Sequence, residues 1–372
     1  MSGACPQCER RSWLLEQLSV GLDFRARELS RFWSLLELPD AKLIDAIGGR
    51  RRAELQTAYA QWEPKQARAG TEIQMICQHH GAYPTGLRDR RLAPHMLGVH
   101  GGLERLAGTL EERVVAIVGT RKASDYGMET ARSLAYSLTA SGVTVASGLM
   151  EGIASAVHSG ALEASGATLT VMAGGLERCS PAHCSSLYRR VISSGCAISE
   201  TPSSLRALRW GESARARTLA LLAHLVIVVE AEEHPLALAC AHLARALGRP
   251  VAAVPGRVCS PASRGTNSLL MEGARLIRDP QDALDLLYGV GMRRAPKPSI
   301  ELEPQLQKVL EEVGEGKDTV AKLTTRGAKP TNVALALTEL ELQGLLLRGD
   351  GGRYVPSAAR PDKRAPKPGY LA

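Results

Sequence analysis

Glycine and cationic residues follow the first apolar run of the central region in a pattern that suits phosphate. The segment over residues 119–127 reads Gly-Thr-Arg-Lys-Ala-Ser-Asp-Tyr-Gly. Where a strand turns through glycine into a helix, free backbone N–H groups and the helix dipole favour an anion, and Arg121 and Lys122 add full charge. The segment matches neither GxGxxG nor GxxxxGK(S/T). It predicts a phosphate-binding loop without a nucleotide fingerprint; a tight turn with solvated charges is the alternative.

Further glycine-bearing loops follow later predicted strands. They contain Ser147, Gly148 and Gly152, then Gly174-Gly175-Leu176 with Pro181, then Ser-Arg-Gly-Thr-Asn over residues 263–267. Because parallel strands end at the same edge of a sheet, we expect these loops to form one phosphate-binding edge. His158 falls inside the helix that follows Gly152. Taken alone, it is better explained as a hydrogen-bonded packing histidine than as a catalytic base.

Cysteine and histidine residues near the start of the chain have the spacing of metal ligands. Cys5-Pro-Gln-Cys8 has the two-residue gap of a zinc knuckle, and the segment Cys-Gln-His-His over residues 77–80 offers further ligands. The alternative is a pair of thiols and an unrelated Cys/His pair. The expected structural zinc ligands are Cys5, Cys8, Cys77 and His79.

Short apolar runs alternate with helix-length segments from residue 113 onward, which predicts a doubly wound α/β sheet of buried parallel strands. The predicted strands are Val114–Val118, Thr144–Ala146, Thr168–Met172, Ala197–Ser199, His224–Val229 and Val251–Val254, with helices over 128–140, 152–164, 184–194, 210–222 and 235–247. Apolar residues at helical spacing precede this region, and helices with a Gly-Asp-Gly-Gly turn follow it. We expect an N-terminal helical module (1–81), the α/β domain (82–288), a basic linker (289–300), a winged-helix-like domain (301–357) and a basic disordered tail (358–372).

The charge balance favours a polyanionic partner. Lys and Arg number 46 against 38 Asp and Glu, a net charge of +8, while Phe, Trp and Tyr make up 4% of 372 residues. Since single-strand platforms often stack bases on rings, a nucleic-acid interface here has to rest on phosphate contacts. The first residues lack the apolar core of a secretory signal, and the apolar stretch 219–229 is too short to span a bilayer. We expect a cytoplasmic protein without membrane association.

Six ordered motifs resemble the DprA/Smf family (DNA-processing protein A), most strongly over residues 82–285. They are Ala-Ile-Val-Gly-Thr-Arg-Lys-x-Ser-x-Tyr-Gly from residue 116, Ser-Gly-Leu-x-x-Gly-Ile from 147, His-x-Gly-Ala-Leu from 158, Val-Val-Glu-Ala from 228, Gly-Arg-Pro-Val-x-Ala-Val-Pro-Gly from 248 and Ser-Arg-Gly-Thr-Asn from 263. The resemblance implies an extended Rossmann fold without cofactor or enzymatic chemistry. It also implies a homodimer that binds and protects single-stranded DNA during transformation and recombination and helps to load RecA.

The resemblance and the charges together indicate a DNA-binding site. Arginines give bidentate phosphate contacts, and glycines let the backbone come close. The chain departs from the family pattern at Glu151, Ala154, Ala216, Pro235 and Leu236, which puts its affinity for nucleic acid in question. The expected site residues are Gly119, Arg121, Lys122, Ser124, Gly127, Ser147, Gly148, Gly152, His158, Arg215, Arg217, Arg264, Gly265 and Asn267.

A second hypothesis makes the protein an enzyme. Rossmann-type nucleoside-monophosphate hydrolases of the lysine-decarboxylase-like (LOG) group also have glycine-rich strand ends, but their Pro-Gly-Gly-x-Gly-Thr-x-x-Glu motif is absent from this sequence. Glu230 ends a strand without an evident catalytic partner, so a binding protein is the preferred interpretation. In the C-terminal domain, the predicted recognition helix within 330–344 has no Lys or Arg to read base edges, which favours an accessory role.

Overall fold

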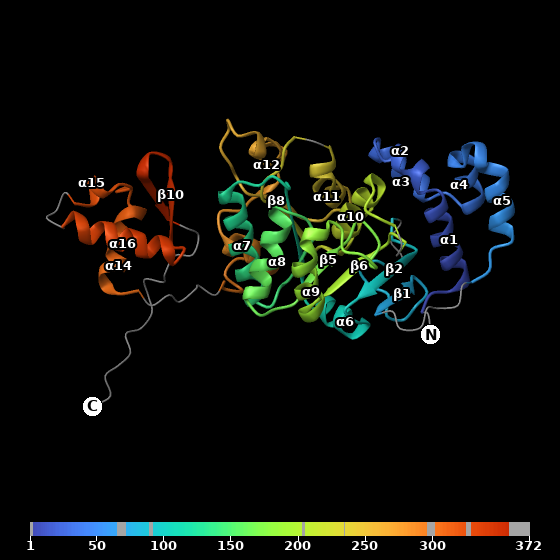
Figure 1. The fold of residues 1–372 in the computed structure, drawn as a ribbon, viewed down its shortest axis with the longest axis horizontal. Helices are drawn as coiled ribbons and strands as arrows, with labels where there is room; N and C mark the ends of the chain where they lie inside the picture. Colours follow the sequence, from blue (N-terminus) through green and yellow to red (C-terminus); the bar gives the residue numbers. More distant parts are fainter. Residues whose placement is uncertain are drawn as a thin grey trace, which may run out of the picture. The chain divides into compact units, whose positions relative to one another are not determined.

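Two compact units make up the chain, one ending at Arg294 and the other beginning at Ala295 (Figure 1). Within the described residues, no helix is both long and apolar enough to cross a membrane. The predicted tail (358–372) and the last part of the predicted linker (296–300) lie outside the described residues. The computed structural model describes residues 3–64, 72–88, 92–202, 205–233, 235–295, 302–324 and 329–356.

A nine-stranded sheet forms the centre of the larger unit, in the order β1-β2-β6-β5-β4-β3-β7-β8-β9. The run from β6 to β9 is parallel throughout, as expected for apolar strands joined by helical crossovers. Each predicted strand is present, with ends that differ by one residue at most. Their bounds are β3 Val114–Val118, β4 Thr144–Ser147, β5 Thr168–Val171, β6 Cys196–Ser199, β7 Leu225–Val228 and β8 Val251–Ala253.

Strands at the two edges were not predicted. β1 (Ile73–Cys77) pairs antiparallel with β2 (Met96–His100), which pairs antiparallel with β6. β1 lies inside the range 1–81 that we assigned to the helical module, so the sheet begins before the expected boundary. The run that forms β2 contains a glycine, which weakens a strand signal. At the opposite edge, β9 (Arg275–Leu276) is short and exposed, so its sequence has no apolar pattern.

Crossover helices cover both faces of the sheet. Helices α7, α8 and α9 connect β3 through β6, after which the order reverses and α10, α11 and α12 connect β6 through β9. Because such crossovers are right-handed, the two sets of helices lie on opposite faces. The helices of this unit are α6 Leu103–Glu111, α7 Asp125–Ala140, α8 Ile153–Glu163, α9 Ser185–Ser194, α10 Arg209–Leu222, α11 Pro235–Ala246, α12 Pro261–Met271 and α13 Pro280–Tyr288.

The strand order reverses between β3 and β7, which are neighbours in the sheet. The chain leaves β3 towards one face and β7 towards the other, so the loops at their carboxyl ends diverge and leave a crevice. Open α/β sheets bind ligands at such a switch point. The loop over residues 119–124 and Glu230 both lie there, because each directly follows one of these strands.

Helices α1 to α5 form a helical module beside α10 (Figure 1). Leu14 and Phe32 belong to its apolar core, and the indole of Trp210 from α10 is buried among them with 1% of its surface exposed. The carboxylate of Asp23 accepts hydrogen bonds from the backbone N–H groups of Arg209 and Trp210, so the module caps α10. The module contains α1 Pro6–Gln17, α2 Ser19–Arg25, α3 Leu29–Leu36, α4 Asp40–Ile47 and α5 Arg52–Ala60.

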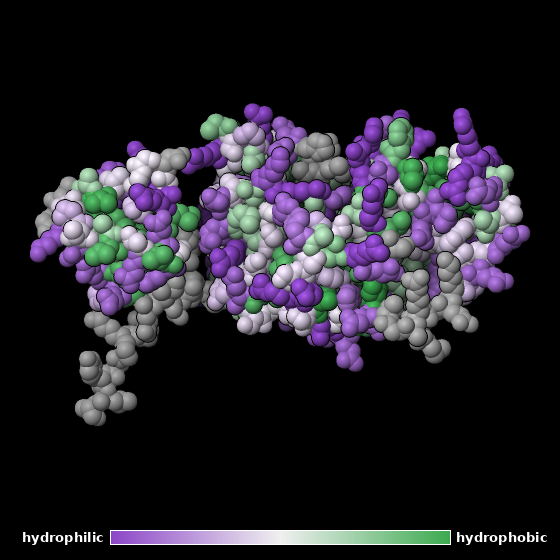
Figure 2. All heavy atoms as spheres, in the orientation of Figure 1, coloured by the Kyte–Doolittle hydropathy of each residue, from purple (hydrophilic) through white to green (hydrophobic). Residues whose placement is uncertain are grey.

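The smaller unit runs helix, helix, helix and a two-stranded antiparallel hairpin. Val333, Leu337 and Leu340 of α16 are buried in its apolar core. Leu335 and Leu342 are 69% and 84% exposed because they lie on another face of the helix. Figure 2 shows hydrophobic residues on the surface of this unit. Its elements are α14 Pro304–Gly314, α15 Val320–Leu323, α16 Pro330–Leu342, β10 Leu346–Gly349 and β11 Arg353–Pro356.

Trp210→Ala should lower the free energy of unfolding by about 3–5 kcal/mol, because it leaves a cavity between the helical module and α10. Urea unfolding followed by circular dichroism measures this change. Phe24→Ala is the control: Phe24 of α2 is 64% exposed, and its loss should change stability by about 0.5 kcal/mol or less. Equal stability of the Trp210→Ala and wild-type proteins would contradict this packing.

Candidate functional site

A hollow of about 440 Å³ opens at the carboxyl ends of β3 and β4, in the crevice beside β7. The first two glycine loops and α10 form its walls. A neighbouring hollow of about 410 Å³ shares part of this lining, so we describe the two together as the switch-point hollow. The residues that line both parts are Arg121, Met150, Glu151, Glu212 and Arg215.

Glu230, two residues past the end of β7, fixes the loop that follows β3. Its buried carboxylate accepts hydrogen bonds from the Ser124 backbone N–H at 2.9 Å and from the Ser124 hydroxyl at 2.6 Å. Its carbonyl oxygen accepts another from the Thr120 N–H at 2.7 Å. Gly127 leaves space for this carboxylate, since a Cβ there would lie 2.3 Å from Glu230 Oε2. The Ser124 hydroxyl also caps α7 by accepting from the Gly127 N–H. Ser124 and Gly127 therefore shape the loop.

Glycines let the first two loops touch. Gly152 has a φ of +77°, and a Cβ there would lie 2.3 Å from the carbonyl oxygen of Arg121. The next residue, Ile153, donates its N–H to the Thr120 carbonyl oxygen at 3.2 Å. A Cβ on Gly119 would lie 2.5 Å from Cγ1 of Ile153. Side chains at either glycine would push the loops apart, so both positions serve a close backbone approach.

Arg121 and Arg215 converge on one carboxylate. Arg121 Nη2 lies 3.0 Å from Glu212 Oε1, and Arg215 Nη2 donates to Glu212 Oε2. The Arg121 side chain is 63% exposed and that of Arg215 is 18% exposed. The Arg215 guanidinium packs against Gly148, where a Cβ would lie 3.1 Å from its Nε. Guanidinium groups bind carboxylates and phosphates in the same bidentate way, so two arginines that share a carboxylate can also bind a phosphate.

The switch-point hollow contains charges of both signs. Lys122 is exposed at its rim. Glu151 is one of the departures from the family pattern, and its carboxylate lies 2.7 Å from His183 Nε2. The net charge is therefore close to neutral, and a polyanion has to compete with the acidic groups. The charged lining residues are Arg121, Lys122, Arg209 and Arg215 with Glu151, Glu212 and Glu232.

His158 and Ser147 do not offer their side chains to a ligand, which corrects their place among the expected site residues and, for His158, confirms the packing role expected of the residue alone. His158 is fully buried; its Nε2 donates to the Gly148 carbonyl oxygen at 2.8 Å, and Nδ1 lies 2.9 Å from Thr168 Oγ1. Burial lowers the pKa of His158 to about 4 by disfavouring the charged ring, although the Gly148 carbonyl opposes the shift. The Ser147 hydroxyl donates to the Ile117 carbonyl oxygen at 2.7 Å. Both residues hold the second loop in place.

Arg217 points away from the switch-point hollow, which also corrects our expectation. Its guanidinium is ion-paired with Glu200 while 5% of its side chain is exposed. It lies over the ring of Trp33 in the helical module, 5.3 Å from the ring centroid. Since side chains two residues apart on a helix differ in direction by about 200°, Arg215 and Arg217 cannot share a face.

The late loop lies on α12 and does not line the switch-point hollow. Gly265 packs against the chain after β7, where a Cβ would lie 2.7 Å from the Glu232 carbonyl oxygen. The Asn267 side chain makes two hydrogen bonds of 3.2 Å to the backbone of Gly256. Gly265 and Asn267 are therefore structural, and of the three expected residues only Arg264 presents an exposed charge.

Glu212 and Met150 are residues of the hollow that the sequence analysis did not single out. Met150 Sδ accepts a hydrogen bond from Arg215 Nη1 at 3.0 Å. Glu212 precedes Arg215 by three residues on a predicted helix. Opposite charges at this spacing pair on a helix surface, so the sequence was sufficient to predict this ion pair. Nothing in the sequence around Met150 pointed to its role.

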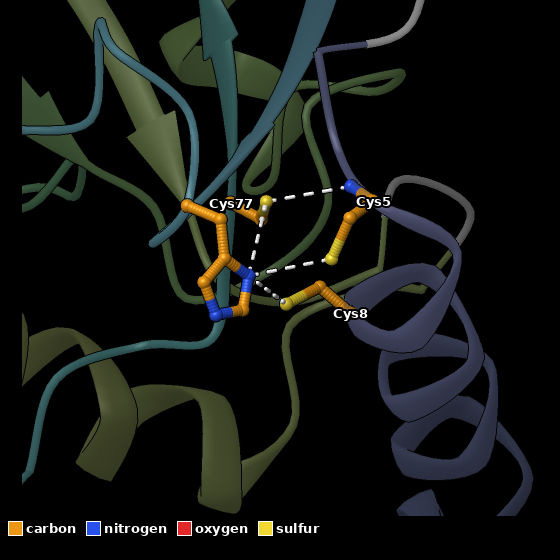
Figure 3. A group of neighbouring side chains, drawn as sticks. Cys5, Cys8 and Cys77 are labelled. Carbon is orange, nitrogen blue, oxygen red and sulfur yellow. Dashed lines mark hydrogen bonds between the residues drawn. The ribbon is translucent and has the colours of Figure 1, made fainter.

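The expected metal ligands meet at a separate place. The donor atoms of Cys5, Cys8, Cys77 and His79 all lie within 4.8 Å of one another. None of the four residues lines the switch-point hollow. Figure 3 shows the three cysteines, which come from the start of α1 and the end of β1.

The fold and the site define a class: an α/β protein of Rossmann type that presents arginines and glycine turns at the switch point of its sheet. Residues 74–288 match the family described as DNA recombination-mediator protein A. This match covers more than half of the chain, and the chain belongs to that family, which includes the DprA and Smf proteins.

Named relatives agree with this assignment. The chain is 37% identical over 248 residues to a putative DNA processing protein DprA of Mycobacterium tuberculosis, which covers 64% of this chain and 63% of that protein. It is 32% identical over 284 residues to protein Smf of Escherichia coli, covering 73% and 74%. The chain thus spans somewhat under two thirds of the mycobacterial relative.

Solved structures show the same fold. The X-ray structure of DNA processing protein A from Streptococcus pneumoniae superposes with a TM-score of 0.59 at 27% identity, covering 73% of this chain and 93% of that one. DNA processing protein A from Helicobacter pylori superposes with a TM-score of 0.52 at 23% identity, covering 59% and 96%.

His158→Gln should make the free energy of unfolding less dependent on pH. The wild-type histidine stays neutral in the fold down to about pH 4, whereas the unfolded chain binds a proton below about pH 6.5. Stability is therefore fully present above pH 6.5 and is lost as the pH falls towards 4, by up to roughly 3 kcal/mol from this group. Urea unfolding at pH 7, 6 and 5 measures the slope.

Ser155→Ala is the matched control for this experiment, because it changes another side chain of α8 and removes no titratable group. It should keep the wild-type pH dependence. A His158→Gln protein with an unchanged slope would contradict the burial of a neutral ring.

Proposed function

We propose that the protein binds single-stranded DNA at the switch-point hollow and processes or protects that DNA in transformation and recombination. The observation that carries the proposal is the convergence of Arg121 and Arg215 on one carboxylate beside glycine turns. Family membership supports it, and the structure from Helicobacter pylori is described as showing a single-stranded DNA binding mode.

The geometry favours recognition of phosphates over recognition of bases. No aromatic side chain is among the residues that line the described hollow, so bases have no ring there on which to stack. Arginine forks and backbone N–H groups contact phosphate oxygens without reading sequence. We therefore infer sequence-tolerant binding that weakens as salt rises, because each neutralised phosphate releases counterions.

The proposal extends to partners and location. We infer that the protein acts as a homodimer in the cytoplasm and assists the loading of RecA on single-stranded DNA, with the C-terminal unit in an accessory role. The cysteines support a reducing compartment, since none of the eight forms a disulfide. Light scattering of the purified protein tests the dimer, and RecA filament assembly on DNA covered by a single-strand binding protein tests the loading.

The enzymatic alternative has less support. Glu230, the one carboxylate that the sequence analysis noted at a strand end, is buried and holds Ser124 by two hydrogen bonds. It therefore has a structural role and faces the loop backbone. Release of free base from nucleoside monophosphates by the purified protein would favour the alternative.

Arg121→Ala and Arg215→Ala should each weaken oligonucleotide binding about tenfold, equivalent to about 1.4 kcal/mol. Each substitution removes a charged group that binds phosphate, so the weakening should be the same for oligo-dT and mixed sequences. The slope of log K against log salt should become shallower by about 0.7 for each phosphate that is no longer neutralised. Fluorescence anisotropy over a salt series measures both quantities.

Arg278→Ala is the control for these variants. Arg278 is an exposed arginine in a 2.7 Å ion pair with Asp282, but it does not line the switch-point hollow. The Arg278→Ala protein should bind the oligonucleotides with the affinity of the wild type. Equally weakened binding in all three variants, or unchanged binding in all of them, would rule out the hollow as the binding site.

Glu212→Gln should increase oligonucleotide affinity several-fold. The Glu212 carboxylate occupies both arginines in the free protein, and a phosphate has to displace it. Glu151→Gln removes the same charge from the same hollow, but Glu151 pairs with His183, so its gain should be smaller. A loss of affinity in Glu212→Gln would mean that this carboxylate positions the arginines and does not compete.

A further inference from the structure

We propose that Cys5, Cys8, Cys77 and His79 bind one structural zinc ion that fastens the helical module to the edge strand β1. This site lies apart from the switch-point hollow and is independent of the proposed DNA binding. Three thiols and one imidazole are the ligand set of a closed zinc site, in which protein atoms fill all four positions.

The distances between the donor atoms fit a tetrahedral zinc ion. The Sγ atoms of Cys5, Cys8 and Cys77 lie 3.3, 3.6 and 3.9 Å from Nδ1 of His79. Zinc bonds of about 2.3 Å to sulfur and about 2.0–2.1 Å to nitrogen place a sulfur and a nitrogen ligand about 3.6 Å apart in a tetrahedron. The three distances scatter around that value, so a single ion fits between the four atoms without rearrangement of the backbone.

Hydrogen bonds alone do not explain this convergence. Three sulfur atoms approach the same imidazole nitrogen (Figure 3), yet that nitrogen has one lone pair in the neutral ring and can accept one hydrogen bond. The cysteines are also free thiols, so no disulfide draws them together. A cation shared by all four donors accounts for the arrangement, because each thiol gives up its proton and points a thiolate at the ion.

The surrounding backbone holds the ligands in place. The backbone N–H of Cys5 points at Cys77 Sγ with a separation of 3.4 Å, a contact that stabilises a thiolate. Gly3 forms a bridge to Ile76 of β1, which aligns the start of the chain with the strand. A Cβ on Gly3 would lie 2.7 Å from the ring of His80, so a larger residue there would have to displace that side chain.

The position of the site indicates what the ion does. Cys5 and Cys8 lie at the start of α1, whereas Cys77 ends β1 and His79 follows it. One ion therefore joins segments about seventy residues apart in the sequence, at the junction of the helical module and the sheet. A closed site of this kind contributes to folding and has no open position for substrate.

Metal analysis of the full-length protein, purified without chelators, tests the proposal. Inductively coupled plasma mass spectrometry should find about one zinc per wild-type chain, and less than a tenth of that in Cys8→Ser and Cys77→Ser. Cys259→Ser is the matched control, because Cys259 is an exposed thiol outside the cluster, and it should keep a full complement. Wild-type protein with no bound metal, or Cys77→Ser with full zinc content, would overturn the proposal.

Cobalt replacement in the wild-type protein tests the site without a substitution that could prevent folding. Wild-type protein stripped of metal and titrated with Co²⁺ should show the visible absorption of a tetrahedral thiolate site, saturating at one equivalent. His79→Cys should keep the metal with a shifted spectrum, whereas His79→Ala should bind it more weakly. Absence of the tetrahedral spectrum, or a Cys5–Cys8 disulfide in freshly purified protein by mass spectrometry, would show that the cluster is not a metal site.

Discussion

The buried carboxylate of Glu230 is the constraint on which the site depends. Glu230 lies past the end of β7, and its carboxylate accepts two hydrogen bonds from Ser124 in the loop after β3. Its backbone carbonyl accepts another from the Thr120 N–H in the same loop. These bonds tie together the two strands between which the sheet order reverses. Without them the loop that carries Arg121 and Lys122 would lose its buried anchor to β7. Residues that we expected to bind a ligand, such as Ser124 and Gly127, therefore shape the loop that positions Arg121 and Lys122.

The sequence was sufficient to predict the parallel sheet, because its strands are short apolar runs between amphipathic helices. It was also sufficient to place the first two glycine loops at one edge, since parallel strands end together, but not to show that residues 263–267 lie within α12. It could not tell which way a side chain points from a helix. Arg215 reaches the hollow and Arg217 reaches Trp33, although they lie only two residues apart on α10. His158 turned inward to bond with Gly148, in the packing role expected of that residue taken alone.

Features that depend on distant segments were beyond the sequence analysis. Strands β1 and β2 precede the region in which strands and helices alternate, and β2 contains a glycine, so their pairing is decided by the open edge of β6. The near-neutral net charge of the hollow was also not predicted, because we did not expect Glu212 and Glu232 to line it. The cysteine cluster is the exception: a two-residue spacing and a later Cys/His pair were enough to name four residues that lie together.

Asp23 supplies the cap of α10 from a position 186 residues earlier in the chain. The same helix then presents Glu212 and Arg215 to the hollow within its first two turns. The helical module is consequently not an appendage that can be removed to give a minimal binding domain. A fragment that begins at the α/β region would expose the Trp210 side chain and remove the cap from the first turn of α10. Arg121 and Arg215 would then lose the positions in which they share the Glu212 carboxylate. The cap of α10 therefore comes from a residue that lies outside the family match over residues 74–288.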